Sequence, residues 1–436
     1  MNINYWNKEV ELADRSQLEQ IQLNRLKETV AWALKTPFYS RSLPKSGINS
    51  PDDITSLDDL KRIPLTTKDD LRQNFPKGFL AVDMDEVVRM HSSSGTTGIP
   101  TVIYFAQSDL DNWTDLVARC VVATGAEKSD VFQNMMTYGL FTGGLGLHYG
   151  AEKVGMTVIP ISSGNTRKQI LTMVDYQTTV VHATPSYLLH IRSAMDEQQV
   201  PLSDIKLRKA MIGAEPHSEN IRLKIEELFG IDAYNSYGLS EMNGPSVAFE
   251  CVYKDSMHIW EDAYIVEVID PNTLQELPDG ESGEIVLTNL IRKATPLLRY
   301  RTRDLSYLLP DVCRCGRNHR RLSRIKGRTD DMLIINGVNV FPSQIEEVIM
   351  KIPEVGTNYL ICVDKKGALD QLTVKVEIYS KMFHGDAREI DKLRSLITEQ
   401  LRGSIMINPK IEFHEPGFLP VSQGKAKRVV DDRPQF

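Results

Sequence analysis

Apolar residues recur with two different spacings along this chain, and the change of spacing divides it into regions. Residues 1–80 show mainly the three-and-four spacing of amphipathic helices, most clearly over 18–36. Two segments rich in branched residues follow, 86–91 and 101–106, and both are predicted to be strands. The sequence thus predicts a helical start followed by two strands that flank a small-residue loop.

From about residue 155, strand-like and helix-like segments alternate. The predicted order is strand, helix, strand, helix and strand, at residues 156–161, 166–176, 178–183, 185–198 and 207–213. This alternation is typical of a parallel sheet covered by helices, so we expect an α/β fold. Ligands gather at the carboxyl ends of such strands, which are followed here by residues 183–186, 213–216 and 235–241.

The sequence pattern changes again over residues 245–325, where it predicts short strands separated by turns. Beyond a boundary near 327–331, Ser343 and Glu346 have the spacing of a helix capping box, and two strands and a helix follow. We therefore predict an N-terminal domain at 1–328 with a β-rich part at about 245–325. The remainder, 329–436, is predicted to be a small, mobile α+β lid domain.

Composition narrows the class of protein. The chain has 436 residues and a formal net charge of −7, which argues against a general nucleic-acid binder. No apolar run reaches the ~18–20 residues of a membrane span, and the first residues lack a signal-peptide pattern. The five cysteines are an odd number in a long chain, unlike a disulfide framework. We expect a cytoplasmic protein without membrane or nucleic-acid partners.

The loop HSSSGTTGIP, residues 91–100, combines hydroxyl side chains with two glycines. Glycine permits backbone angles that let several N–H groups converge on an anion, so the loop is a candidate phosphate site. It lacks the lysine of a Walker loop, and a strand follows where a helix should begin. A flexible, solvated hairpin turn is the alternative interpretation.

Two acidic side chains are candidate ligands for a nucleotide. Glu241, in NSYGLSE, could hold Mg²⁺ beside phosphates; the alternative is a capped helix start with Ser240 as the N-cap. In RYRTRDLS, a strand would place Asp304 opposite the arginines at positions 299, 301 and 303 and leave it free to bind ribose. A surface ion-pair cluster is the alternative there.

Charged residues near the C-terminus add two further candidates. GRTDD, residues 327–331, places an arginine and two acids at the predicted boundary, where a charged linker is the alternative. Lys425 follows a glycine in a polar tail and could neutralise a phosphate transiently, unless it is only a solvated terminal lysine.

In order and spacing, these motifs together resemble the adenylate-forming superfamily. The series is SSSGTTGIP, GAEP, YGLSE, YRTRD, GRTDDMLIINGVNVFP and SQGKAKR, and from about residue 20 onward the chain resembles phenylacetate–CoA ligases. The resemblance implies two steps: a carboxylate attacks the α-phosphate of ATP, giving an acyl-adenylate and diphosphate, and coenzyme A then displaces AMP. Thr101 stands where many superfamily members have lysine after the loop, a departure that the phenylacetate branch shares.

The resemblance also implies a role for each matching residue. Lys425, Glu241 and Thr96 would be catalytic, with Glu241 holding Mg²⁺ and Lys425 bridging the carboxylate and the α-phosphate. Asp330 would be the hinge of the lid domain. The residues that would bind ATP or AMP are Ser93, Ser94, Gly95, Thr96, Thr97, Gly98, Gly213, Ala214, Glu215, Pro216, Tyr237, Gly238, Ser240, Asp304 and Arg328. Gly337 and Val338 would line the coenzyme A tunnel.

Residues 135–150, MMTYGLFTGGLGLHYG, mix aromatic side chains with glycines, as a pocket for a flat aromatic acid would require. The candidates for this acyl pocket are Tyr138, Phe141, Gly143 and Pro245. Ordinary core packing at a helix start is the alternative for each of them.

A separate group of residues suggests a structural metal site. Cys313 and Cys315 lie one residue apart, and Cys251 and His258 lie in a predicted hairpin of the same β-rich region. A closed zinc site needs about four ligands, so we expect these four to hold one Zn²⁺, with His319 as a reserve ligand. The alternative is four unrelated residues.

Three rival functions remain open. The first passes the acyl group to a carrier-protein thiol instead of coenzyme A, and the second is a non-catalytic nucleotide-binding protein. The third, a zinc-ribbon nucleic-acid binder, fits poorly with the acidic charge. The sequence favours an ATP-dependent ligase whose partners are a small aromatic carboxylic acid, ATP and coenzyme A; the oligomeric state is left open, a homodimer included.

Overall fold

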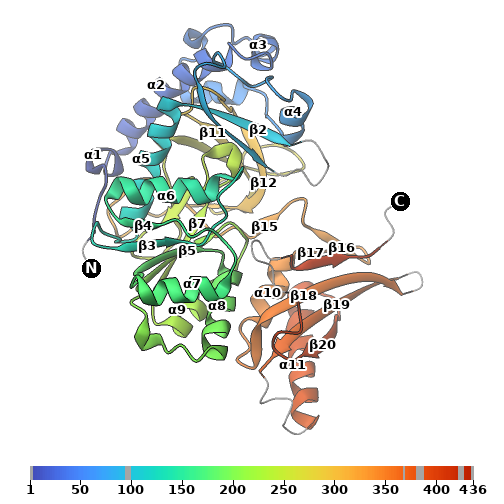
Figure 1. Ribbon diagram of the computed structural model, residues 1–436. Coiled ribbons are helices and arrows are strands. Elements are labelled where there is room, and N and C mark those ends of the chain that lie inside the picture. Colours follow the sequence, from blue (N-terminus) through green and yellow to red (C-terminus); the bar gives the residue numbers. More distant parts are fainter. Residues whose placement is uncertain (1–2, 94–99, 367–368, 380–386, 421–426, 434–436) are drawn as a thin grey trace.

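The computed structural model describes residues 3–93, 100–366, 369–379, 387–420 and 427–433. Figure 1 shows a large N-terminal domain, coloured from blue to yellow, and a smaller C-terminal domain in orange and red. The helices of the large domain are α1 (Lys8–Glu11), α2 (Arg15–Ala33), α3 (Tyr39–Ser42), α4 (Lys68–Gln73), α5 (Gln107–Ala123), α6 (Thr142–Val154), α7 (Thr166–Asp175), α8 (Pro185–Glu197) and α9 (Glu219–Phe229). Short 3₁₀ turns are η1 (Pro44–Ser46), η2 (Pro51–Asp53), η3 (Leu57–Arg62), η4 (Leu202–Asp204) and η5 (Ser240–Met242).

The largest sheet runs in the order β13-β14-β9-β8-β7-β6-β5-β3-β4. Its strands are β3 (Val131–Asn134), β4 (Thr157–Ile159), β5 (Val180–Ala183), β6 (Lys209–Gly213), β7 (Asp232–Tyr237), β8 (Ala248–Glu250), β9 (Met257–Ile259), β13 (Leu308–Leu309) and β14 (Arg321–Leu322). The half from β7 to β4 is parallel and the half from β7 to β13 is antiparallel. The predicted alternation of strands and helices is confirmed for the parallel half.

Two apolar cores lie on the two faces of this parallel half. One contains residues of α5 and α6, and the other contains residues of α7, α8 and α9. Figure 1 shows α6 on one side of the strands and α7 to α9 on the other. With both faces covered, the strands are buried and only their ends remain available for a ligand.

Two smaller sheets complete the large domain. The hairpin of β1 (Val87–Ser93) and β2 (Thr101–Ala106) is antiparallel, and Ser93 pairs with Thr101 at its end. The other sheet has the order β10-β11-β12-β15. Its strands are β10 (Tyr264–Ile269), β11 (Gly283–Asn289), β12 (Tyr300–Ser306) and β15 (Gly327–Arg328). The predicted change to a β-rich region is therefore confirmed.

The C-terminal domain packs two helices against a sheet of order β20-β19-β18-β21, with a separate hairpin of β16 and β17. Its elements are β16 (Leu333–Ile335), β17 (Val338–Val340), α10 (Pro342–Ile349), β18 (Val355–Lys366), β19 (Leu369–Ile378), α11 (Ala387–Ile405), β20 (Lys410–His414) and β21 (Val429–Asp431). A small α+β domain is thus confirmed, and the division after residue 328 stays our proposal.

The predicted capping box of Ser343 and Glu346 is wrong. Helix α10 begins after Phe341, whose N–H donates to the Gln344 side chain at 2.9 Å. Ser343 instead donates to the Lys326 carbonyl, and Glu346 accepts hydrogen bonds from groups outside α10. Both side chains therefore bind other parts of the fold. Local sequence spacing does not reveal such contacts.

The arginines around β12 also differ from the prediction. Arg299 lies before the strand with φ 44°, and its guanidinium binds the buried Glu267 at 2.7 Å. Arg301 and Asp304 do lie on opposite faces, because burial alternates along β12. Arg301 binds the buried Glu284 at 2.6 Å, so these arginines form structural ion pairs beneath the surface rather than a solvated cluster.

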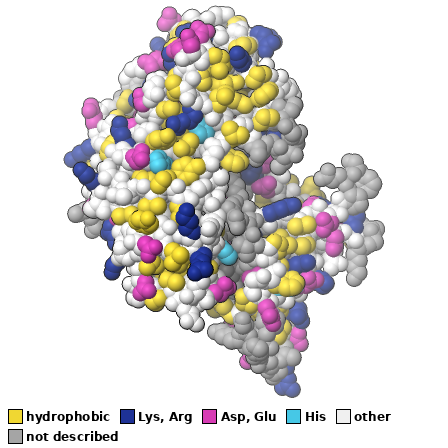
Figure 2. All heavy atoms as spheres, viewed as in Figure 1, with side chains coloured by type: hydrophobic (Ala, Val, Ile, Leu, Met, Phe, Trp, Pro, Cys, Tyr) yellow, Lys and Arg dark blue, Asp and Glu magenta, His cyan; other side chains and the backbone are white. Residues whose placement is uncertain are grey.

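Charges of both signs are interspersed over the face of the molecule shown in Figure 2. Within the described part of the chain, none of the helices combines the length and apolar character needed to cross a membrane.

Candidate active site and metal centre

The loop after β6 is held in an unusual backbone conformation. A β-carbon on Gly213 would lie 2.3 Å from the Ser236 hydroxyl of β7, so only glycine fits where these strands approach each other. Ala214 follows with φ 67°, a left-handed conformation that costs a non-glycine residue about 1 kcal/mol or more. This strain, at one of the residues predicted to bind ATP or AMP, supports a functional role for the loop.

Three predicted nucleotide-binding residues meet beside this loop. The Tyr237 hydroxyl donates to Asp304 Oδ2 at 2.6 Å, and the Arg328 guanidinium donates to Asp304 Oδ1 at 3.0 Å. Asp304 and Arg328 are register partners on β12 and β15. Burial raises the pKa of the Asp304 carboxyl and of the Tyr237 hydroxyl. The carboxylate is a buried acceptor of the kind that could bind ribose hydroxyls.

Glu241 lies one short turn beyond β7 and is buried. Its Oε1 accepts a hydrogen bond from the Thr101 hydroxyl at 3.3 Å and pairs with the Lys68 ammonium at 3.3 Å. Thr101 also contacts the Ser93 hydroxyl across the hairpin. Glu241 therefore stands at the base of the predicted phosphate loop, where oxygen ligands suit Mg²⁺.

The remaining residues predicted for the nucleotide site fall into two groups, those outside the described residues and those within them. Ser94, Gly95, Thr96, Thr97, Gly98 and Lys425 lie outside the described residues. Gly238 is described, and a β-carbon there would lie 2.6 Å from Gly244 Cα, so the chain after β7 is tightly packed. Ser240 is not a helix N-cap, because it is the first residue of the 3₁₀ turn η5, whose N-cap is Leu239. The roles assigned to these residues stay predictions.

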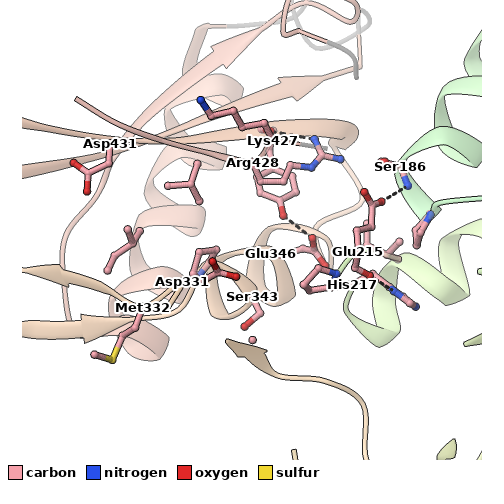
Figure 3. Close-up of a pocket in the computed structure, with 18 of the residues that line it drawn as sticks. Ser186, Glu215, His217, Asp331, Met332, Ser343, Glu346, Lys427, Arg428 and Asp431 are labelled. Atoms are coloured by element: carbon pink, nitrogen blue, oxygen red, sulfur yellow. Dashed lines mark hydrogen bonds between the residues drawn. The ribbon is translucent and has the colours of Figure 1, made fainter. Parts of the chain in front are cut away.

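A cavity of about 490 Å³ lies between the two domains, next to the loop after β6. Figure 3 shows Glu215 and His217 facing Glu346 and Arg428 of the C-terminal domain across it. Glu215 accepts a hydrogen bond from Ser186 N–H at 2.8 Å. The cavity is lined by Pro185, Ser186, Leu189, Glu215, Pro216, His217, Ile221, Gly327, Asp330, Asp331, Met332, Leu333, Pro342, Ser343, Glu346, Tyr359, Lys427, Arg428, Val429, Asp431 and Arg433. Glu215, Pro216 and Asp330 were predicted as site residues.

The predicted hinge and coenzyme A residues lie on the C-terminal side of this cavity. Asp330 accepts two hydrogen bonds from Arg328, at 2.9 and 3.1 Å, immediately after β15. Asn336 and Gly337 have φ of 49° and 83° and form the tight turn between β16 and β17. A β-carbon on Gly337 would meet nothing within 4 Å, so the turn is exposed there. The hinge and tunnel roles stay predictions.

The four candidates for the acyl pocket surround the start of α6 but differ in exposure. The Tyr138 hydroxyl is held by Asn134 at 2.9 Å and contacts His148 at 3.1 Å, whereas Phe141 is 45% exposed. A β-carbon on Gly146 would lie 2.8 Å from Pro245, so Pro245 packs against α6, and Gly143 lies in the first turn of that helix. Their role in binding an acid stays a prediction.

Sequence reasoning missed several residues that the fold brings to these sites. The Asn134 side chain joins Tyr138 to His182, whose Nδ1 lies 3.2 Å from the Asn134 amide oxygen. Burial lowers the pKa of His182 to about 3, so the imidazole is neutral. Lys68, at Glu241, was also missed. His182 does lie near the end of the strand predicted at 178–183, and that position was the available signal, whereas no strand was predicted at Asn134.

The four predicted metal ligands converge. The ligand atoms of Cys251, His258, Cys313 and Cys315 all lie within 4.8 Å of one another, and all four residues are buried. The Cys251 and Cys313 sulfurs are 3.7 Å apart, and Cys315 Sγ lies 3.3 Å from His258 Nε2. Hydrogen bonds among the thiols lower the pKa values of Cys313 and Cys315, which favours their thiolate forms, and raise the pKa of Cys251, which keeps its proton in the absence of a metal.

His319, the reserve ligand, does not join this group. Its Nδ1 accepts a hydrogen bond from Glu261 N–H at 3.0 Å, and its Nε2 lies 3.2 Å from the Val10 carbonyl. Both ring nitrogens are thus occupied by the backbone, so the ring holds the N-terminal segment against the loop that carries the cysteines.

Comparisons with known proteins agree with this geometry. The AMP-binding enzyme family matches residues 34–290, and the AMP-binding enzyme C-terminal domain matches 337–433. The phenylacetate-coenzyme A ligase of Pseudomonas putida is 44% identical over 97% of this chain and 96% of that protein. The ligase of the same name from Aromatoleum evansii is 45% identical over 98% and 97%.

Two solved structures of 2-hydroxyisobutyryl-CoA ligase differ in how closely they match this chain. The structure in the postadenylation state with R3-HIB-AMP gives a TM-score of 0.92 at 26% identity, covering 98% of this chain and 92% of that one. The structure with 2-HIB-AMP and CoA in the thioesterification state gives 0.73 at 27% identity, with the same coverage. The described arrangement of the two domains therefore resembles the postadenylation structure more closely than the thioesterification structure.

Asp304 provides a pH-dependent test of the nucleotide site. We expect the KM for ATP to rise as the pH falls through the raised pKa of Asp304, because protonation removes the acceptor for ribose. Asp304→Asn should raise the KM about tenfold or more at neutral pH and flatten this dependence, since a hydrogen bond to a charged group contributes about 1.5–3 kcal/mol. Steady-state kinetics between about pH 5 and pH 8 measure both effects; an unchanged profile in Asp304→Asn would contradict the assignment.

Proposed function

The chain belongs to the phenylacetate-coenzyme A ligase family of AMP-binding enzymes, and on this premise we propose that its acid substrate is phenylacetate or a close aryl relative. The enzyme is an ATP-dependent, AMP-forming acid–CoA ligase. The observation that carries the proposed substrate is the similarity to phenylacetate-coenzyme A ligases over nearly the whole chain. Tyr138 and the glycines near it are the residues that we assign to the ring of the acid.

The reaction has two steps that balance in atoms and charge. A carboxylate oxygen of the acid attacks the α-phosphorus of ATP, the α–β phosphoanhydride bond breaks, and diphosphate leaves. The coenzyme A thiol then loses its proton and attacks the acyl carbon, and AMP leaves with the electrons of the acyl–oxygen bond. Adenylation is needed because a free carboxylate has a poor leaving group.

In this proposal, each described group has one task. Asp304 accepts hydrogen bonds from ribose and is held ready by Tyr237 and Arg328. Glu241 would hold Mg²⁺, which supplies positive charge beside the phosphates; until then Lys68 and Thr101 satisfy its carboxylate. Lys425 would bring a further positive charge to the α-phosphate, where charge develops in the first step.

A panel of acids tests the substrate. With ATP and coenzyme A present, we expect AMP release with phenylacetate to exceed that with acetate or a long-chain fatty acid by at least about 100-fold in kcat/KM, a difference of about 2.7 kcal/mol. Coupled AMP assays measure each rate. Equal rates with phenylacetate and acetate would refute an aryl substrate while leaving the ligase activity intact.

Lys425 can be tested by separating the two half-reactions. Lys425→Ala should reduce acid-dependent ATP–diphosphate exchange by about 100-fold or more, because transition-state charge loses its partner. Thioester formation from supplied acyl-adenylate should persist. Lys392→Ala, which alters another exposed lysine of the same domain, serves as the control. Equal loss of both half-reactions would contradict the assigned role.

We further propose that Cys251, His258, Cys313 and Cys315 hold one structural Zn²⁺. A tetrahedral zinc with sulfur at about 2.3 Å and nitrogen at about 2.0 Å places its ligand atoms roughly 3.5–3.8 Å apart. The separations of 3.7 Å and 3.3 Å are close to this range. Sulfur-rich tetrahedral sites favour zinc or iron–sulfur centres, and four protein ligands leave no open position, so the ion would be structural.

The surroundings of the four ligands fit a fixed metal site. Gly316 has φ 82° and turns the chain directly after Cys315. Arg317 Nε binds the buried Glu11 carboxylate at 2.6 Å, and its Nη2 donates to the Asn4 carbonyl at 2.7 Å. The Tyr5 hydroxyl donates to the Cys315 carbonyl at 2.7 Å. Such outer contacts orient ligands and offset their charge, and here they also fasten the N-terminal segment over the site.

Metal analysis tests the zinc proposal. Protein purified without added zinc should contain about one zinc per chain, and Cys313→Ser/Cys315→Ser should lose it. Cys362→Ser removes a thiol outside the cluster and should keep the metal. Loss of zinc should also change the fluorescence of Trp260, whose ring stacks on His258 at 6.2 Å. A zinc content unchanged by the double substitution would refute the site.

A further inference from the structure

Helix α9 meets the C-terminal domain at its N-cap residue. Ser218 caps the helix, and its N–H donates to Glu346 Oε1 at 2.6 Å. Glu346 comes from α10 of the other domain, and its second oxygen accepts from the Tyr359 hydroxyl at 2.5 Å. A carboxylate at a helix N-terminus interacts favourably with the helix dipole, so this contact is well suited to joining two bodies.

Further along the same side of α9, Lys224 reaches the C-terminal domain as well. Its ammonium donates to the Val355 carbonyl at 2.8 Å and lies 3.4 Å from the Gly356 carbonyl. Asn220 stands one turn earlier, and its amide donates to the Glu347 carbonyl at 3.3 Å. Burial lowers the pKa of Lys224.

Apolar packing accompanies these polar contacts. Ile221 and Ile225 of α9 belong to the same cluster of buried residues as Ile345 and Ile349 of α10. Apolar contact supplies most of the free energy of such an interface but has little directional preference, whereas hydrogen bonds require one relative orientation. The polar contacts along α9 can therefore select the orientation of the smaller domain.

We propose that Ser218, Asn220 and Lys224 of the α9 segment form a docking surface. This surface holds the C-terminal domain in the arrangement that precedes thioester formation, and Lys224 is its principal positioning residue. This inference rests on the proposed two-step reaction. It is supported by the match to the postadenylation structure of 2-hydroxyisobutyryl-CoA ligase and the poorer match to the thioesterification structure. Moving to the second arrangement must break the contacts of Ser218, Asn220 and Lys224, so their strength sets the balance between the two half-reactions.

Lys224 suits this role because its partners are backbone carbonyls. Any side chain at Val355 or Gly356 would leave those acceptors in place, so the contact depends on the lysine and on the position of the loop before β18. A buried ammonium that loses these carbonyls on undocking regains water in their place. The contact is thus moderate in net strength, which suits an interface that must open in every catalytic cycle.

The test compares Lys224→Met with Lys224→Arg and with Lys206→Met, a control at an exposed lysine of the same domain. Two rates are measured: acid-dependent ATP–diphosphate exchange and thioester formation from supplied acyl-adenylate. We expect Lys224→Met to raise the ratio of the second rate to the first about tenfold. Lys224→Arg keeps a donor and should restore most of the original ratio, and Lys206→Met should leave it unchanged.

Hydrogen exchange provides a readout that is independent of activity. In Lys224→Met, the amides around Ser218 and Gly356 should exchange faster, because undocking exposes them. If Lys224→Met changed neither the ratio of the two rates nor the amide hydrogen exchange, the proposed docking surface would be overturned. An equal loss of both half-reactions would overturn it as well. A lack of acid-dependent exchange in the unmodified enzyme would instead refute the proposed reaction, and the amide measurement would still test the docking.

Discussion

The buried carboxylate of Asp304 is the group on which the arrangement of the proposed nucleotide site depends. Burial raises its pKa, so it requires donors, and it finds them in Tyr237 and Arg328. Tyr237 ends β7 of the largest sheet, whereas Asp304 and Arg328 belong to β12 and β15 of another sheet. One side chain therefore ties two sheets together beside the loop that carries Gly213. Because Arg328 also binds Asp330, the same interaction extends to the start of the C-terminal domain.

Buried polar groups with specific partners recur where the chain must be held in one position. The pair of Glu11 and Arg317 is fully buried and fastens the N-terminal segment over the loop of Cys313 and Cys315. Glu346 is buried between the domains and is satisfied by Ser218 and Tyr359. Such groups add little net stability, but leaving one partner unmet costs several kcal/mol, so they favour a single arrangement. The same preference operates in the loop of Cys313 and Cys315 and at the interface between the two domains.

Much of the fold followed from local patterns. Strands at 101–106 and 178–183, the helices at 166–176 and 185–198, and the β-rich region were all predicted by apolar spacing and turn residues. A parallel sheet could be predicted because the sequence alternates between strand-like and helix-like segments. The two kinds of segment can be told apart because their apolar residues recur with different periods. The capping box at Ser343 failed for the opposite reason: both side chains bind residues far away in sequence, and local spacing carries no record of such partners.

The sequence by itself determined the chemical groups: a hydroxyl–glycine loop, Glu241, Asp304, Arg328 and a Cys/His set, in an order that resembles one enzyme family. Tertiary structure decided which groups meet. Lys68 pairs with Glu241, and Asn134 contacts His182. Both ring nitrogens of His319 contact backbone groups, and Lys224 donates to the Val355 carbonyl. Residue type and spacing reflect constraints within an element, whereas contacts between distant elements arise only when sheets and domains pack, and that packing depends on the whole chain.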